Sequence, residues 1–171
     1  MRSTLALASL AALFALSFPA NAAPVNLSPV SFSPEFQTAL DEDLGAREGE
    51  RLQADLVRAV TRELAARGAT IGEGALTIEL SIIDAAPNRP TWRQLTDRPG
   101  LDYIRSISVG GADLRAILRG ADGQVVGEVT HRRYNYSIED AAIGASSTWS
   151  EAQRTIRRFA SRVADAYVAA Q

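Results

Sequence analysis

The spacing of apolar residues changes several times along this chain, and the clearest period is helical. Between residues 46 and 67 arginines and acids occupy one face, and the opposite face carries Leu52, Leu56, Val60 and Leu64. This four-residue repeat predicts an amphipathic helix. Gly68 follows directly, at the place where a left-handed glycine cap is typical.

A second helical stripe closes the chain. Thr148 and Glu151 have the spacing of a capping box, which predicts that a helix begins at Thr148. Arginines line its solvent side, and its apolar stripe consists of Trp149, Ala152, Ile156, Phe159, Val163 and Tyr167. We therefore expect this helix to pack on the core, with Trp149 buried.

Alternation with a period of two marks the strands. Residues 76–83 alternate apolar and polar positions, which predicts a half-buried strand. Residues 106–136 are predicted to form two strands joined at Asp122-Gly123, the strongest hairpin signal in the sequence. The apolar positions change from odd to even across Gly110-Gly111, which predicts a β-bulge there.

The register of this hairpin has two alternatives. A two-residue turn at Asp122-Gly123 places Leu114 opposite His131. A three-residue turn with Gly123 as a bulge shifts the pairing by one residue and places Asp113 opposite His131. The sequence leaves both registers open.

The remaining segments carry prolines and no sustained period. Residues 23–45 are predicted to form an extended N-terminal arm or edge strand, because prolines favour such positions. Residues 84–105 are predicted to form a long loop, a feature that is often functional. The whole pattern indicates an α+β fold. We expect a two-layer sandwich with a mainly antiparallel sheet of three to four strands and two amphipathic helices on one face.

The first residues have the organisation of a secretory signal peptide. Arg2 precedes an apolar run, Pro19 breaks it, and Ala20-Asn21-Ala22 supplies small residues for cleavage. This order predicts a signal peptide over residues 1–22 and a single domain over residues 23–171. The apolar run of about 14 residues is short for a membrane span, so we expect no transmembrane segment after cleavage.

The chain contains no cysteine. A lipid-carrying cysteine, disulfides and thiolate chemistry are therefore excluded, and we expect a soluble, periplasmic protein without a lipid anchor. Its 18 basic residues, all arginine, face 20 acidic ones. This mildly acidic balance gives no indication of nucleic-acid binding. The sequence also predicts no metal site and no cofactor, since His131 is the only histidine, and it sets no oligomeric state.

Several motifs resemble those of a known family. Asn88-Arg89-Pro90-Thr91 follows a predicted strand, the run 108–112 (SVGGA) precedes the next one, and Trp149 and Phe159-Ala160 lie in the last helix. Together with Asp122-Gly123, this succession resembles a family of small proteobacterial envelope proteins of unknown function, many of them lipoproteins. The resemblance implies an exported α+β domain and no catalytic residue. This chain departs from the family pattern because it lacks the lipid-carrying cysteine.

Two groups of residues are candidates for binding. Arg132, Tyr134 and Tyr136 combine arginine with aromatic rings, which are enriched at interface hot spots. Arg89, Trp92 and Arg93 lie in the long loop.

Three hypotheses follow. The first is a non-enzymatic domain that binds or scaffolds another envelope component. The second is a small anionic ligand held by arginines of residues 85–105, which requires a pocket containing Trp92 and at least two arginines. The third is a hydrolase in which Asp113 orients His131 as a general base; no Gly-x-Ser-x-Gly motif accompanies these residues.

Overall fold

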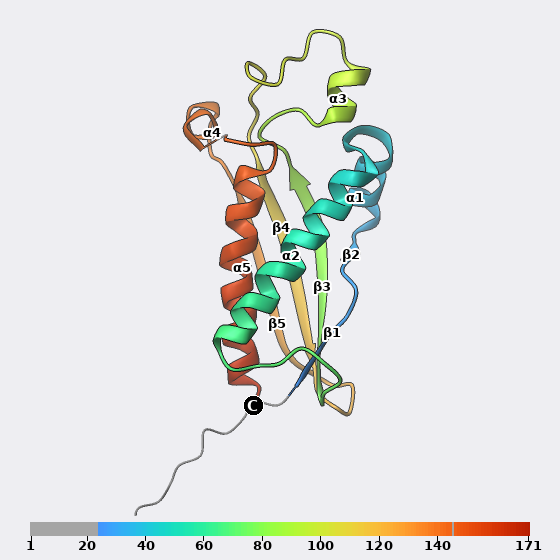
Figure 1. The fold of residues 1–171 in the computed structure, drawn as a ribbon, viewed down its shortest axis with the longest axis vertical. Helices are drawn as coiled ribbons and strands as arrows, with labels where there is room; N and C mark the ends of the chain where they lie inside the picture. Colours follow the sequence, from blue (N-terminus) through green and yellow to red (C-terminus); the bar gives the residue numbers. More distant parts are fainter. Residues whose placement is uncertain (1–23, 145) are drawn as a thin grey trace, which may run out of the picture.

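The computed structural model describes residues 24–144 and 146–171, so the predicted signal peptide lies outside the described residues. The described elements, in chain order, are β1 (Val25–Leu27), β2 (Ser31–Phe32), α1 (Pro34–Ala39), the π-helix η1 (Leu40–Leu44), α2 (Ala46–Ala66), β3 (Leu76–Ala86), α3 (Trp92–Asp97), β4 (Gly111–Arg119), β5 (Val125–Tyr134), α4 (Ile138–Gly144) and α5 (Ser150–Ala169). Figure 1 shows an elongated molecule in which the long helices α2 and α5 lie side by side on one face of the sheet.

The sheet follows the order β1-β3-β4-β5, and β2 also pairs with β3. β3, β4 and β5 are antiparallel, whereas β1 and β2 run parallel to β3 along the same edge. The predicted α+β class, the mainly antiparallel sheet and the two covering helices are confirmed. The sheet has five strands in the described residues instead of three or four, because the proline-rich segment contributes two short strands.

The predicted arm over residues 23–45 is correct only up to Phe32. Ser33 then caps α1, since its Oγ accepts a hydrogen bond from the N–H of Phe36 at 3.1 Å. Pro34 occupies the first helical turn, where its missing N–H and fixed φ are no disadvantage. Residues 34–44 are helical and bury Phe36, Leu40 and Leu44, so the prediction of an extended arm is wrong there.

The core lies between the helices and the sheet and uses the predicted stripes. Leu52, Leu56, Val60 and Leu64 of α2 are at most 1% exposed, and α2 ends one residue before its predicted end. Gly68 adopts a φ of 84°, as expected of a left-handed cap. Trp149 is buried as predicted, and its Nε1 donates a 2.6 Å hydrogen bond to Glu48 at the start of α2.

The predicted bulge at Gly110-Gly111 is wrong, because β4 begins only at Gly111. The bulge lies instead in the partner strand β3, between Ile82 and Asp84. It moves the buried positions of β3 from even residues such as Ile82 to the odd residue Ala85. Gly111 faces the backbone of β5 closely, so a Cβ at this position would meet the carbonyl of Arg133.

The β4–β5 hairpin combines both predicted alternatives. The N–H of Gly123 bonds the carbonyl of Gly120 at 2.9 Å and Gly123 has a φ of 77°, which is the three-residue turn with a glycine bulge. A further register shift follows, because Arg119 pairs with Val125 while Leu118 pairs with Gly127. The strands beyond it therefore have the other register, with Leu114 opposite His131.

Candidate docking surface

One end of the molecule carries most of the irregular chain. We call it the distal end and define it as the loop of residues 87–110, which includes α3, together with residues 136–144, which include α4. It lies at the top of Figure 1, opposite the β4–β5 turn. The loop leaves the sheet at the end of β3 and returns at the start of β4. The second segment follows the end of β5 and leads into α5.

Asn88 holds the base of this end together and is fully buried. Its backbone bonds Thr148 and Ser108, at 2.7 and 3.0 Å. Its side-chain Nδ2 donates to the Oδ1 of Asn135 at 3.0 Å, and its Oδ1 accepts from the N–H of Glu151 at 2.9 Å. Asn88 thus joins the segments that follow β3 and β5 to the start of α5.

The contact with Glu151 also corrects the predicted capping box. The N-cap of α5 is Trp149 and makes no side-chain capping bond. The orphan N–H of Glu151 is satisfied by Asn88, which lies 63 residues away in the chain. The distal loop is therefore coupled to the last helix through one buried amide.

α3 is held by polar contacts and contains no buried residue. A capping box between Thr91 and Gln94 begins the helix. The carboxylate of Asp43, in η1, then accepts hydrogen bonds from Gln94 Nε2 at 2.7 Å and from Arg98 Nη2 at 2.5 Å. Arg93 donates to the backbone carbonyl of Asp41 at 2.5 Å, so α3 rests on the turn before α2.

Arg89 and Arg93, predicted as ligand-binding residues, support the loop itself. Arg89 donates 2.8 Å hydrogen bonds to the carbonyls of Tyr103 and Ile104, and its guanidinium lies 5.6 Å from the Tyr103 ring centroid. Arg93 also pairs with Asp97 at 3.3 Å. Both arginines hold the loop in one shape.

The predicted anion pocket in this loop is not formed in the described structure. The side chain of Trp92 is 79% exposed. A hollow of about 360 Å³ beside the loop is lined by residues that include Pro87, Leu101 and one arginine, Arg98, but not by Trp92. The condition of a tryptophan and two arginines around one pocket is therefore not met.

Large apolar side chains are exposed at the distal end in two groups. In the loop, Trp92 and Ile104 are 79% and 74% exposed, with Tyr103 beside Ile104. In the second segment, Tyr136 and Ile143 are 92% and 90% exposed, accompanied by Ile138. The other exposed large hydrophobic residues of the described chain, Ile71, Val125, Val126 and Val168, belong to segments at the opposite end.

The second predicted group is split by the structure. Arg132 and Tyr134 lie on the sheet face opposite the helices, with the Arg132 guanidinium 5.5 Å from the Tyr134 ring centroid. The Tyr134 hydroxyl bonds Asp84 at 2.5 Å, and burial together with this carboxylate raises the pKa of Tyr134. Tyr136 lies beyond the end of β5 and belongs to the distal end.

His131 and Asp113 do not form the dyad that a hydrolase would need. Asp113 pairs with Arg132 in the β4–β5 register, whereas His131 pairs with Leu114 of the core. Because side chains alternate along a strand, the imidazole and the carboxylate point to opposite faces of the sheet. The hydrolase arrangement is thus absent from the described residues.

Comparisons with known proteins show the fold. Neither protein-family models nor curated protein sequences match this chain. The chain is structurally similar to the hypothetical protein CT253 from Chlamydia trachomatis, with a TM-score of 0.50 and 10% identity over 85% of this chain and 97% of that one.

Two further solved structures are more distant. A PelC dodecamer from Paraburkholderia phytofirmans has a TM-score of 0.45 and 10% identity, over 84% of this chain and 85% of that one. A minor lipoprotein from Acinetobacter baumannii has a TM-score of 0.39 and 13% identity, over 82% of this chain and 91% of that one. At these identities the similarities describe the fold and no activity. Within the described residues, moreover, no helix combines the length and apolar character that a bilayer span requires.

Proposed function

We propose that this protein is a non-enzymatic periplasmic domain that docks another envelope protein through its distal end. The observation that carries the proposal is the exposure of Trp92, Ile104, Tyr136 and Ile143 at one end of an otherwise well-packed domain. Exposed aromatic and aliphatic side chains of this size are anchors of protein interfaces. The resemblance of the sequence to a family of exported envelope proteins supports the same function.

The composition of the distal end favours a protein partner over an anionic surface. Its loop carries four arginines and two aspartates, and α4 adds Glu139 and Asp140, so opposite charges balance. Arg89, Arg93 and Arg98 are moreover bound to carbonyls and carboxylates of this chain. An apolar centre with a mixed-charge rim is the usual composition of a protein–protein interface.

The loop is also suited to docking because it is already ordered. Arg89 fixes the two carbonyls beside the exposed Tyr103 and Ile104, and Asp43 fixes α3, which presents Trp92. A surface held in one shape loses less conformational entropy on binding than a mobile one. Export to the periplasm follows in this proposal from the signal peptide predicted at residues 1–22.

Site-specific photocrosslinking in the native host tests the proposal. A photoreactive amino acid placed at Ile104 and, separately, at Ile143 is expected to give an adduct with the same envelope protein. The matched control is Val126, which is also exposed but lies at the opposite end. The same adduct from position 126, or no adduct from either distal position, would contradict a distal docking surface.

A binding measurement with the captured partner, purified, completes the test. Trp92→Ala is expected to weaken its affinity at least about thirtyfold, as truncation of an aromatic hot spot costs about 2 kcal/mol or more. Trp92 is not part of the core, so the melting temperature should stay unchanged. Unaltered affinity for both Trp92→Ala and Ile143→Ala would overturn the assignment.

A further inference from the structure

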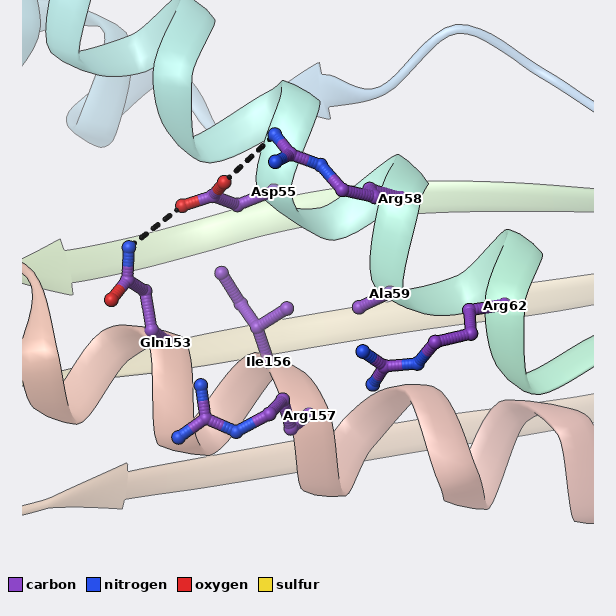
Figure 2. Close-up of a pocket in the computed structure, with 7 residues that line it drawn as sticks. All are labelled: Asp55, Arg58, Ala59, Arg62, Gln153, Ile156 and Arg157. Atoms are coloured by element: carbon purple, nitrogen blue, oxygen red, sulfur yellow. Dashed lines mark hydrogen bonds and ion pairs between the residues drawn. The ribbon is translucent and has the colours of Figure 1, made fainter.

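A hollow of about 250 Å³ opens between α2 and α5, and none of its lining residues belongs to the distal end (Figure 2). We call it the arginine groove; its lining residues are Asp55, Arg58, Ala59, Arg62, Gln153, Ile156 and Arg157. Arg58 and Arg62 come from α2 and Arg157 from α5, with Ala59 and Ile156 between them (Figure 2). Ala59 and Ile156 are buried and give the groove an apolar floor.

The charge of the groove is not balanced by its own carboxylate. Asp55 is the only acid among the lining residues. It already accepts a hydrogen bond from Arg58 Nη2 at 3.1 Å and another from Gln153 Nε2 at 2.9 Å. Three guanidinium groups and one carboxylate leave a net charge of about +2 among the lining residues.

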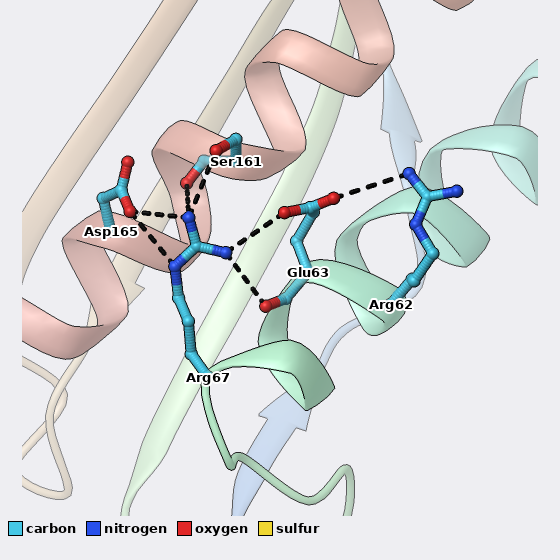
Figure 3. A network of polar contacts seen from close by, with 5 residues as sticks. All are labelled: Arg62, Glu63, Arg67, Ser161 and Asp165. Carbon is cyan, nitrogen blue, oxygen red and sulfur yellow. Dashed lines mark hydrogen bonds and ion pairs between the residues drawn. The ribbon is translucent and has the colours of Figure 1, made fainter.

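Two acids near the groove, Glu63 and Asp165, form ion pairs with Arg67, about one helical turn further along α2. Arg67, at the end of α2, pairs with Glu63 at 3.1 Å and with Asp165 of α5 at 2.7 Å (Figure 3). It also donates to the hydroxyl of Ser161 at 3.1 Å. Arg62 reaches Glu63 only at 3.5 Å, on the other carboxylate oxygen. The two helices are thus tied together by Arg67, and the groove keeps the excess of positive charge.

Arg157 is the least engaged of the three. Among the described residues, its guanidinium has no hydrogen-bond or ion-pair partner. It lies across the groove from Arg62, on the other helix. A ligand between them could therefore bind both helices at once, without displacing a strong internal ion pair.

We propose that the arginine groove binds a phosphate monoester. A phosphate monoester carries nearly two negative charges at neutral pH and three outer oxygens, which matches the net charge of the groove and the number of its arginines. Each guanidinium can offer two parallel N–H donors to such a group. A carboxylate has one charge and two oxygens, and so it satisfies only part of this donor set.

The apolar floor suits the ester substituent, which would lie over Ala59 and Ile156. The ester can belong to a free small molecule or to a phosphorylated headgroup displayed on a surface. Both sources share the same phosphate chemistry. No residue that lines the groove belongs to the distal end, so phosphate binding and protein docking can be tested separately.

Calorimetric titration of the mature protein with phenyl phosphate at low salt tests the proposal. We expect saturable binding that weakens with added salt and becomes at least tenfold weaker in the double variant Arg62→Gln, Arg157→Gln. Both side chains are exposed, so an unchanged melting temperature will show that the variant is folded. The control Arg115→Gln removes an exposed arginine from the opposite sheet face and should bind as the natural chain does.

Two comparisons complete the experiment. Phosphatidylcholine vesicles with phosphatidic acid, set against phosphatidylcholine alone, show whether a surface headgroup is bound through the same arginines. Acetate shows whether any anion suffices. Absent phenyl phosphate binding, equal affinity for acetate, or equal loss in Arg115→Gln would each overturn the proposal. Retained phosphate binding in Trp92→Ala separates this site from the docking surface.

Discussion

The imidazole of His131 lies on the helix side of β5, under α5. Its Nε2 is buried and has no hydrogen-bond partner in the described residues. Burial lowers the pKa of His131 below its ordinary value of 6.5. Arg162 and Arg158 of α5 and Arg133 of β5 lower it further, and Asp113 of β4 opposes them weakly. The folded protein therefore disfavours the charged imidazolium.

This shift makes stability depend on pH in a defined direction. Because the pKa is lower in the folded state, the unfolded chain binds more protons near pH 6, and the free energy of unfolding falls as the pH falls below 6.5. His131→Gln removes this contribution, so urea unfolding between pH 7.5 and about 5 should show a shallower pH dependence than in the natural chain. At pH 7.5 the two free energies should differ by about 1 kcal/mol or less. If the free energies of unfolding of the two proteins change with pH in parallel, the pKa of His131 is not lowered in the folded state.

The residues that the sequence predicted well are those whose role depends on local spacing. The α2 stripe and Trp149 are buried because a helical period places them on one face, whatever the partner. Asn88 and Asp43 could not be found in this way, because their partners lie 63 and 55 residues away. The same limit applies to Arg89 and Arg93, whose bonds to distant carbonyls follow only from the fold.

At the scale of elements, long and strongly periodic segments were predicted within a few residues, whereas short helices were missed. α1, α3 and α4 have six or seven residues each, which is too short to show a full apolar stripe. The bulge was placed on the wrong strand for a related reason. A parity change at Gly110-Gly111 in one strand does not reveal whether it or its neighbour carries the extra residue.

The attachment of α3 to η1 gives a prediction at this scale. Asp43→Asn weakens the bonds of its carboxylate to Gln94 and Arg98, while α3 contributes no buried residue to the core. We expect the amides of Leu95 and Arg98 to exchange hydrogen about tenfold faster, with the global free energy of unfolding changed by about 0.5 kcal/mol or less. Hydrogen exchange measured by NMR checks both quantities.

Asp41→Asn is the matched control. Among the described residues, the Asp41 side chain bonds Gln37, one turn earlier, and no residue of α3. Arg93 uses the backbone carbonyl of Asp41, which the substitution keeps. Exchange in α3 should therefore stay as in the natural chain. If Asp43→Asn and Asp41→Asn accelerate α3 equally, the helix is held by charge in general and not by the Asp43 contacts.

At the scale of the whole molecule, the hydrophobic core contains no residue of the loop 87–110, and this loop is built on the core. The buried hydrophobic residues described for the chain include Ala85 and Ala112 but none of residues 86–111. The two ends of the loop meet, since Ala86 pairs with Gly111 and Asn88 bonds Ser108. The loop is therefore an excursion from the β3–β4 hairpin.

Shortening this excursion tests whether the core folds without the loop. In a first variant, residues 90–106 are replaced by Asn-Gly, which suits a two-residue hairpin turn and keeps Asn88 and Ser108. The variant loses the contacts of Asp43 with the loop, but closing a shorter loop costs less conformational entropy. We therefore expect cooperative urea unfolding, with a free energy of unfolding within about 2 kcal/mol of that of the natural chain. Unfolding without cooperativity would show that the loop is part of the core.

A second variant replaces residues 87–110 by the same Asn-Gly turn and thereby removes Asn88 as well. The N–H of Glu151 at the start of α5 then loses its acceptor, and Asn135 loses a donor. An unsatisfied buried polar group costs about 1–3 kcal/mol, so this variant should be less stable than the first by about that amount. The difference between the two variants measures what the base of the loop, residues 87–89 and 107–110 with Asn88 at its centre, contributes to stability, separately from the residues that the loop presents for docking.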